Sequence, residues 1–271
     1  MLNKVALLGA CHDHNSSFMR GSAAAPAAIR TVLHNGSANL TSESGLNLSA
    51  PGMLHDLGDL DVEQTCAGVM QLADSLSAVI AQGFRPLTLG GDHAITFPLV
   101  KAVYERYGVV DILHFDAHSD TYPEFDDNPN SHASPFARIV EQGYVGRLVQ
   151  VGIRTMTDLT TQFTEAHAIE VLPWRGELPE LPLTFERPVY VSIDIDALDP
   201  AFAPGVSHHE PGGMSVRDVL QILQGLRANV VAADIVEYNP ARDWHDMTAM
   251  VCAKFVKELA ALLATSTSQT I

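Results

Sequence analysis

Short apolar segments recur along the chain, and they constrain its fold more than any other feature of the sequence. They are rich in Val, Ile and Leu and alternate little with polar residues, which is typical of β-strands covered on both faces. An apolar fraction of 46% is sufficient for a large buried core, so the composition excludes a mainly disordered chain. The segments are residues 5–9, 86–90, 110–116, 148–153, 188–196 and 230–238.

Stretches with helical periodicity separate these segments. We predict helices over residues 61–82, 215–226 and 247–264. Ser215 and Asp218 match the capping pattern of a helix N-terminus. Strands that alternate with helices predict an α/β fold with three layers, α/β/α, around a mostly parallel central sheet.

The organisation of the chain is predicted to be simple. No internal repeat or linker-like segment divides it, so we expect one domain over residues 1–271. The last six residues, STSQTI, are polar and are expected to fray.

The charge of the chain limits its partners. There are 16 Lys and Arg against 32 Asp and Glu, which gives a formal net charge of −16. Nucleic acids and anionic membranes need a positive surface, so we expect neither as a partner. A small cationic substrate is compatible with an acidic protein.

Cysteine usage and the N-terminal residues bear on the compartment. Cys11, Cys66 and Cys252 are widely spaced and form no C-x-x-C pair, which indicates a reducing environment. MLNKVALLGA is interpreted as a short strand, not as the apolar part of a signal peptide. The sequence therefore predicts a cytoplasmic protein.

Histidine and carboxylate side chains concentrate where the predicted strands end. In a parallel sheet the carboxyl ends of the strands line the ligand crevice. Buried charges there are costly unless they are paired or bind metal. The segments are GGDHAIT (90–96), FDAHSD (115–120), SIDIDALDP (192–200) and DIVEYNP (234–240).

The spacing within these segments indicates a metal site. In an extended strand, Asp116, His118 and Asp120 would point to one side, and Asp194 and Asp196 repeat this spacing. Carboxylates packed together repel one another, and a pair of divalent cations removes that repulsion. Imidazole and carboxylate ligands without cysteine favour Mn²⁺, and less specifically Zn²⁺, Fe²⁺ or Ni²⁺. Two such cations can activate a water molecule near neutral pH.

Several neighbouring residues have simpler interpretations. Asp92 is expected to cap a turn, and His114 to be a buried histidine with satisfied hydrogen bonds. His208 and His209 are expected at a surface or at the rim of a pocket. Asp199 is expected to stabilise a turn or the surroundings of the ligands.

Together, GGDH, DAHSD and SIDIDALDPAFAPG resemble the ureohydrolase family, which contains arginases and agmatinases. Over nearly the whole chain, the sequence looks most similar to the plant-type, agmatinase-like arginases. Further segments that carry this resemblance are HNSSF (14–18), SHASPFARI (131–139), LVQVGIR (148–154), APGVSHHEPGGMSVRDVL (203–220) and MTAMVCAK (247–254).

The resemblance implies roles for individual residues. His132 would be the proton-shuttle histidine, and Glu237 would bind the guanidinium group of the substrate. Asp120 would also orient the nucleophile. The ligands of one Mn²⁺ would be His93, Asp116, Asp120 and Asp194, and those of the other Asp116, His118, Asp194 and Asp196.

The resemblance further implies hydrolysis of a guanidino group to urea and an amine, most simply L-arginine to L-ornithine. Animal-type arginases hold the substrate amino group with an acid shortly after the G-[IL]-R segment, where this chain has Thr155, Met156 and Thr157. Agmatine or another guanidino acid, such as guanidinobutyrate, is therefore an alternative, and formiminoglutamate a lower one. Relatives are usually homo-oligomers, trimers or hexamers.

Two other functional classes fit less well. A binuclear metallophosphatase would use D-x-H, but G-H-x-H and a basic phosphate cradle are missing from the sequence. An inactive metal-binding subunit would not need the intact set of ligands together with His132 and Glu237.

Overall fold

The computed structural model describes residues 2–266 and contains one eight-stranded sheet. The strand order is β2-β1-β3-β8-β7-β4-β5-β6, and every neighbouring pair is parallel. The α/β fold with a parallel central sheet is therefore confirmed. The strands are β1 (Lys4–Gly9), β2 (Leu54–Asp59), β3 (Phe84–Leu89), β4 (Val110–Phe115), β5 (Val145–Val151), β6 (Glu170–Leu172), β7 (Leu183–Asp194) and β8 (Leu226–Val236).

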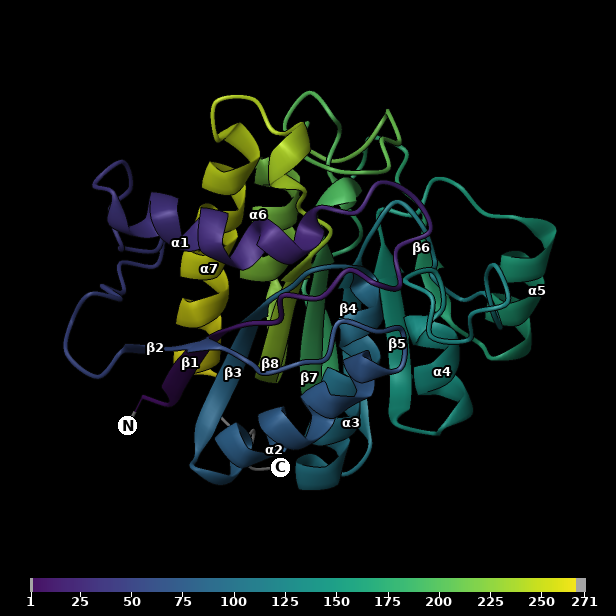
Figure 1. The fold of residues 1–271 in the computed structure, drawn as a ribbon, viewed down its shortest axis with the longest axis horizontal. Coiled ribbons are helices and arrows are strands. Elements are labelled where there is room, and N and C mark those ends of the chain that lie inside the picture. The colour runs from purple at the N-terminus through teal and green to yellow at the C-terminus, as the bar shows by residue number, and fades with distance from the viewer. Residues whose placement is uncertain (1, 267–271) are drawn as a thin grey trace.

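Helices cover both faces of this sheet (Figure 1). One hydrophobic core packs α1, α6 and α7 against one face, and a second packs α2, α3 and α4 against the other. β1 shows the division, since Val5 and Leu7 belong to the first core and Ala6 and Leu8 to the second. The helices are α1 (Ala25–His34), α2 (Leu72–Ala81), α3 (Thr96–Tyr107), α4 (Pro135–Glu141), α5 (Asp158–Ala166), α6 (Val216–Gln224) and α7 (Met247–Thr265).

Two of the three predicted helices are confirmed, and the third is partly wrong. The helix over 215–226 is confirmed as α6, and Ser215 and Asp218 form the expected capping box. The helix over 247–264 is confirmed as α7. The prediction over 61–82 was wrong for residues 61–67, because α2 begins only at Leu72, after a short 3-10 turn.

Tertiary contacts explain why residues 61–67 are not helical. The carbonyl of Cys66 accepts a hydrogen bond from Asn15, and the carbonyl of Thr65 lies 2.9 Å from Nε2 of His12. These contacts hold the segment against the loop that follows β1. The backbone carbonyls bond to side chains of that loop and not to the amides of a further helical turn. The predicted fraying of STSQTI concerns residues that, apart from Ser266, lie outside the described part of the chain.

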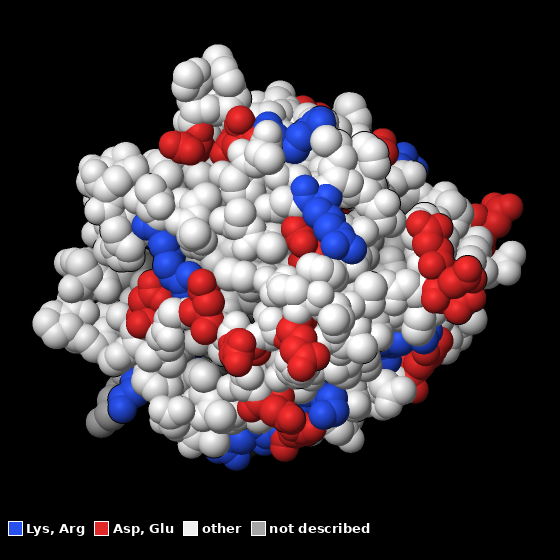
Figure 2. Space-filling model, in the orientation of Figure 1, with Lys and Arg blue, Asp and Glu red and all other residues white. Residues whose placement is uncertain are grey.

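Strands β2 and β6 are the edges of the sheet, and neither was predicted from the sequence. β2 has the sequence LHDLGD and is largely exposed, and β6 has three residues. Neither has the apolar run of a covered strand. In residues 2–266 no helix combines the length and hydropathy that a membrane span needs. On the face seen in Figure 2, basic side chains are scattered among acidic ones and form no broad positive patch.

Candidate metal centre

The predicted site residues meet at the carboxyl ends of four adjacent central strands. Asp194 ends β7, Asp116 directly follows β4, and Glu237 directly follows β8. His93 begins the 3-10 turn η3 (His93–Ile95) after β3. The chain crosses from β3 to β4 and later inserts β7 and β8 between them, so segments far apart in the sequence meet at this edge. Ligands of such sheets usually bind outside the carboxyl ends of the strands.

A first cluster surrounds His93, which is buried. Its Nδ1 lies 3.0 Å from Oδ2 of Asp120, 3.2 Å from Oδ2 of Asp194 and 3.3 Å from Oδ2 of Asp116. Despite these short distances, Nδ1 makes no hydrogen bond with any described residue. An imidazole nitrogen that faces three carboxylate oxygens without bonding to any of them is arranged as a ligand set for a cation.

A second cluster lies beside the first and shares Asp116 with it. Nδ1 of His118 is 3.1 Å from Oδ2 of Asp196 and 3.4 Å from Oδ1 of Asp116. Asp116 therefore points one carboxylate oxygen at each cluster, which is the arrangement of a bridging ligand.

The backbone brings these residues together differently from the prediction. The idea of one extended strand over residues 116–120 was wrong, because β4 ends at Phe115. Asp120 instead has a left-handed backbone, with φ of 49°, and Glu237 has φ of 64°. Asp194 and Asp196 are likewise separated by the start of a 3-10 turn. A left-handed backbone is costly for residues other than glycine, and residues that adopt it concentrate at functional sites.

The carboxylates of the two clusters are buried close together and shift one another's pKa values. Burial and the charges of Asp196 and Asp116 raise the pKa of Asp194 well above its usual value. Burial also raises the pKa of Asp196, where His118 opposes the shift and Asp116 adds to it. For Asp116 burial acts in the same direction, but the neighbouring imidazoles of His114, His118 and His93 hold its pKa well below the usual range. A bound divalent cation would favour the ionised form of all three.

Both ring nitrogens of His114 have hydrogen-bond partners within the protein. Its two ring nitrogens contact Oδ2 of Asp116 at 2.8 Å and Nε2 of Gln150 at 3.1 Å. The predicted role of a buried, satisfied histidine is confirmed, although its partner is one of the candidate ligands. Asp92 is confirmed as a capping residue, since it accepts a hydrogen bond from the backbone of Ala94.

His132 and Glu237 form a buried pair beside the two clusters. Nδ1 of His132 is 2.9 Å from Oε1 of Glu237, and this oxygen also accepts a hydrogen bond from the backbone of His93. Burial lowers the pKa of His132, but the charge and hydrogen bond of Glu237 outweigh it and raise the pKa to about 9. The imidazole therefore holds a proton at neutral pH.

These groups open into a cavity of about 180 Å³, which suits a small substrate. His208 lies at this cavity, and His209 is exposed and contacts the carbonyl of Pro204, so both positions agree with the prediction. Ser17, Tyr122 and Phe125 were not predicted, because nothing in their local sequence marks them as functional. The lining residues are Ser17, His118, Asp120, Tyr122, Phe125, His132, Ala133, Asp194, Asp196, His208 and Glu237.

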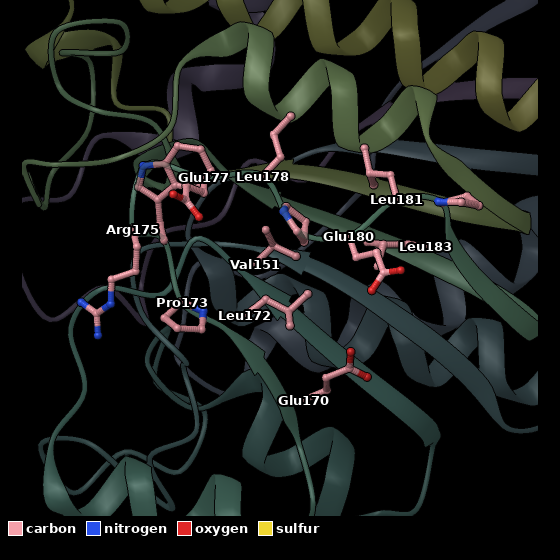
Figure 3. Close-up of a pocket in the computed structure, with 13 residues that line it drawn as sticks. Val151, Glu170, Leu172, Pro173, Arg175, Glu177, Leu178, Glu180, Leu181 and Leu183 are labelled. Carbon is pink, nitrogen blue, oxygen red and sulfur yellow. The ribbon is translucent and has the colours of Figure 1, made fainter.

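A larger cavity, of about 580 Å³, lies elsewhere, between β6 and the segment 173–183 (Figure 3). Its lining is mostly Leu, Pro and Trp, with Arg175 at one side and Glu180 at the other. No histidine or aspartate lines it, so the candidate site is the smaller cavity.

Known proteins resemble the chain over almost its full length. The family model described as "Arginase family" matches residues 3–261. "Arginase, mitochondrial" of Medicago truncatula is 47% identical over 276 residues, which cover 96% of this chain and 82% of that protein. "Arginase 1, mitochondrial" of Arabidopsis thaliana is 48% identical over 96% of this chain and 81% of its own length. The solved structure of the arginase from Medicago truncatula superimposes with a TM-score of 0.89 at 44% identity, and the match covers 97% of this chain and 89% of that one.

These names correct the predicted compartment. The expectation of a cytoplasmic protein is contradicted, because the matched plant relatives are named mitochondrial and point to an organelle. Unpaired cysteines indicate a reducing environment, which does not distinguish the cytoplasm from the interior of an organelle.

Proposed function

Because the chain belongs to the arginase family, we propose that it hydrolyses the guanidino group of L-arginine to L-ornithine and urea. The observation that carries this proposal is the convergence of two histidine and carboxylate clusters on one small cavity that also contains Glu237. A guanidinium is planar and permanently charged, and an acidic cavity of this size complements it.

The clusters fit two divalent cations, and we propose Mn²⁺ for both. The unbonded Nδ1 of His93 and the donor set of oxygen and nitrogen atoms support this choice. Cations held there supply Lewis-acid activation of a water molecule at neutral pH. The proposed ligands are His93, Asp116, Asp120 and Asp194 at the first position, and Asp116, His118, Asp194 and Asp196 at the second.

Glu237 is proposed to bind the guanidinium. Its Oε1 is already occupied by His132 and the backbone of His93, whereas Oε2 accepts no hydrogen bond from the described residues. The pKa of Glu237 is lowered: burial opposes ionisation, but the charge of His132 outweighs it. The carboxylate can therefore accept hydrogen bonds from guanidinium nitrogens and hold the carbon near the candidate ligands.

Asp120 and His132 are proposed to manage the protons. Water adds to the guanidinium carbon, and Asp120, which lines the cavity beside His93, is placed to orient the attacking oxygen and accept its proton. The bond from that carbon to the chain nitrogen then breaks. The chain nitrogen needs two protons to leave as an ammonium group. Asp120 returns the proton that it took from the water, and His132 gives the other and regains a proton, through solvent, from the hydroxyl that becomes the urea oxygen. The products are urea and the protonated amine.

Agmatine remains the second candidate, on one specific observation. No Lys or Arg lines the cavity, so the described lining offers no cationic partner for the carboxylate of an amino acid. Agmatine lacks this carboxylate and therefore needs no cationic partner in the cavity. The identity with plant arginases favours arginine.

A urea-release screen decides between these substrates. Purified protein loaded with Mn²⁺ is given L-arginine, agmatine or 4-guanidinobutanoate under identical conditions. We expect kcat/KM for arginine to exceed that for agmatine by about tenfold or more, the value of one hydrogen bond from an uncharged donor of the lining to the carboxylate that agmatine lacks. A preference for agmatine would replace the proposed substrate, and the absence of urea from all of them would contradict the proposed reaction.

We also propose that the protein is a homo-oligomer, a trimer or a hexamer, and that neither a nucleic acid nor a membrane is its partner. The single-domain organisation over residues 1–271 is proposed as well, supported by the one sheet that joins strands from Lys4 to Val236.

A further inference from the structure

A row of polar side chains crosses the sheet one step before the candidate ligands. Five strands contribute one residue each, and the register places neighbours in the row directly opposite one another. All of them are buried. Central parallel strands are normally apolar on both faces, so a row of polar groups needs a specific reason. From β3 to β5 the row is Thr88, Asp234, Ser192, His114 and Gln150.

One part of the row orients His93. Oγ of Ser192 is 2.6 Å from Oδ1 of Asp234 and 3.0 Å from Nε2 of His93. An ionised carboxylate only accepts hydrogen bonds, so the Ser192 hydroxyl donates to Asp234. The same hydroxyl then has a lone pair left to accept from Nε2–H of His93. This direction leaves Nδ1 without a proton, and Nδ1 is the atom that faces the three carboxylates.

Asp234 is itself fixed by two other donors. Its Oδ2 accepts hydrogen bonds from the Tyr190 hydroxyl at 2.7 Å and from the Thr96 hydroxyl at 2.7 Å. Hydroxyl groups thus bond both oxygens of the carboxylate, and among the described residues Ser192 is the one that connects it to a candidate ligand.

The other part of the row orients His114 in the same manner. Nε2 of Gln150 is 2.7 Å from the carbonyl oxygen of Ser119, which can only accept, so this atom is the amide nitrogen. It also donates to Nδ1 of His114. The proton of His114 therefore lies on Nε2, from which it is donated to Oδ2 of Asp116.

We propose that this row fixes the tautomers of His93 and His114, and that Ser192 and Asp234 are positioning residues for the cation at the first position. The inference rests on the metal positions proposed above. Hydrogen bonds to the second nitrogen of a ligand histidine commonly set its orientation and the metal affinity. In this protein the residues that orient the histidines belong to the sheet itself, and the strand register fixes their relative positions.

A matched pair of variants tests the proposal. Ser192→Ala and Tyr190→Phe each remove one hydroxyl that donates to Asp234, but only Ser192 also contacts His93. Mn²⁺ binding is measured by titration calorimetry. We expect Ser192→Ala to weaken one of the two Mn²⁺ by about 10- to 100-fold, and Tyr190→Phe to leave both within about threefold. Equal effects of the two variants would overturn the proposal.

A second measurement needs no variant. In wild-type protein loaded with diamagnetic Zn²⁺, ¹⁵N NMR of labelled histidines should show His93 with its proton on Nε2. A proton on Nδ1 would overturn the inference. Failure of the proposed function is distinguishable, because in that case the wild type binds no Mn²⁺ or, with two Mn²⁺ bound, releases no urea from any guanidino compound.

Discussion

Replacing Asp116 by Asn is expected to abolish urea release and to remove bound metal from both positions. Asp116 directs Oδ2 toward the cluster of His93 and Oδ1 toward that of His118, so one substitution weakens both. Removing one charge from a buried ionic cluster costs about 3–5 kcal/mol, or roughly 10²- to 4 × 10³-fold in affinity. Metal analysis after dialysis, together with the urea assay, measures both effects.

Asp199→Asn is the matched control for this prediction. Asp199 follows Asp196 in the same acidic segment, but its carboxylate accepts hydrogen bonds from the backbone of Ala201, Gly212 and Gly213. We expect this variant to retain two Mn²⁺ per chain. If Asp116→Asn bound as much metal as Asp199→Asn, the bridging role of Asp116 would be wrong.

His132→Ala is expected to have the second largest effect, on turnover alone. A positioned general acid contributes about 10²- to 10⁴-fold to a rate, so kcat should fall within that range. The nitrogens of His132 contact Glu237 and Ser17 but no candidate ligand, so metal content should stay near two per chain. Loss of metal from this variant would show that His132 is a structural support of the metal centre.

The pH dependence of the wild type provides an independent check on His132. Its pKa is raised to about 9, so the proton needed by the leaving amine is present below that pH and is lost as the pH rises through it. We expect kcat to decline above about pH 9. The Glu237 interaction with the protonated imidazole stabilises the fold below the unfolded histidine pKa of about 6.5, and this contribution is lost as the pH rises through about 9.

The sequence was sufficient to predict the fold class because the central strands are covered on both faces. Their apolar runs are unmistakable at residues 110–116 and 188–196, which form β4 and part of β7. The edge strand β2 could not be found in this way. It is not buried, so polar residues such as His55 and Asp56 stand where a central strand has apolar ones. The error over residues 61–67 arose because contacts with the loop after β1 override helical periodicity.

The structure brings together the candidate site residues that the sequence singled out, because most of them lie at the carboxyl end of a strand or within a few residues of it, whereas His132 lies just before α4. The proposed roles remain predictions. Sequence spacing did not reveal how Asp120 reaches its neighbours, because the left-handed turn there depends on tertiary structure. Ser17 was missed as a contact of His132, since more than a hundred residues separate the two. The polar row was equally hidden, because only strand register aligns Ser192 with Asp234.

The central claim is that hydrolysis of a guanidino group depends on two cations held at the carboxyl ends of the central strands. The most direct test measures urea release from L-arginine while the metal-free protein is titrated with Mn²⁺. We predict no urea without metal and a rate that rises until two Mn²⁺ are bound per chain. Full activity of the metal-free protein, or no urea from any guanidino compound with two Mn²⁺ bound, would contradict the claim.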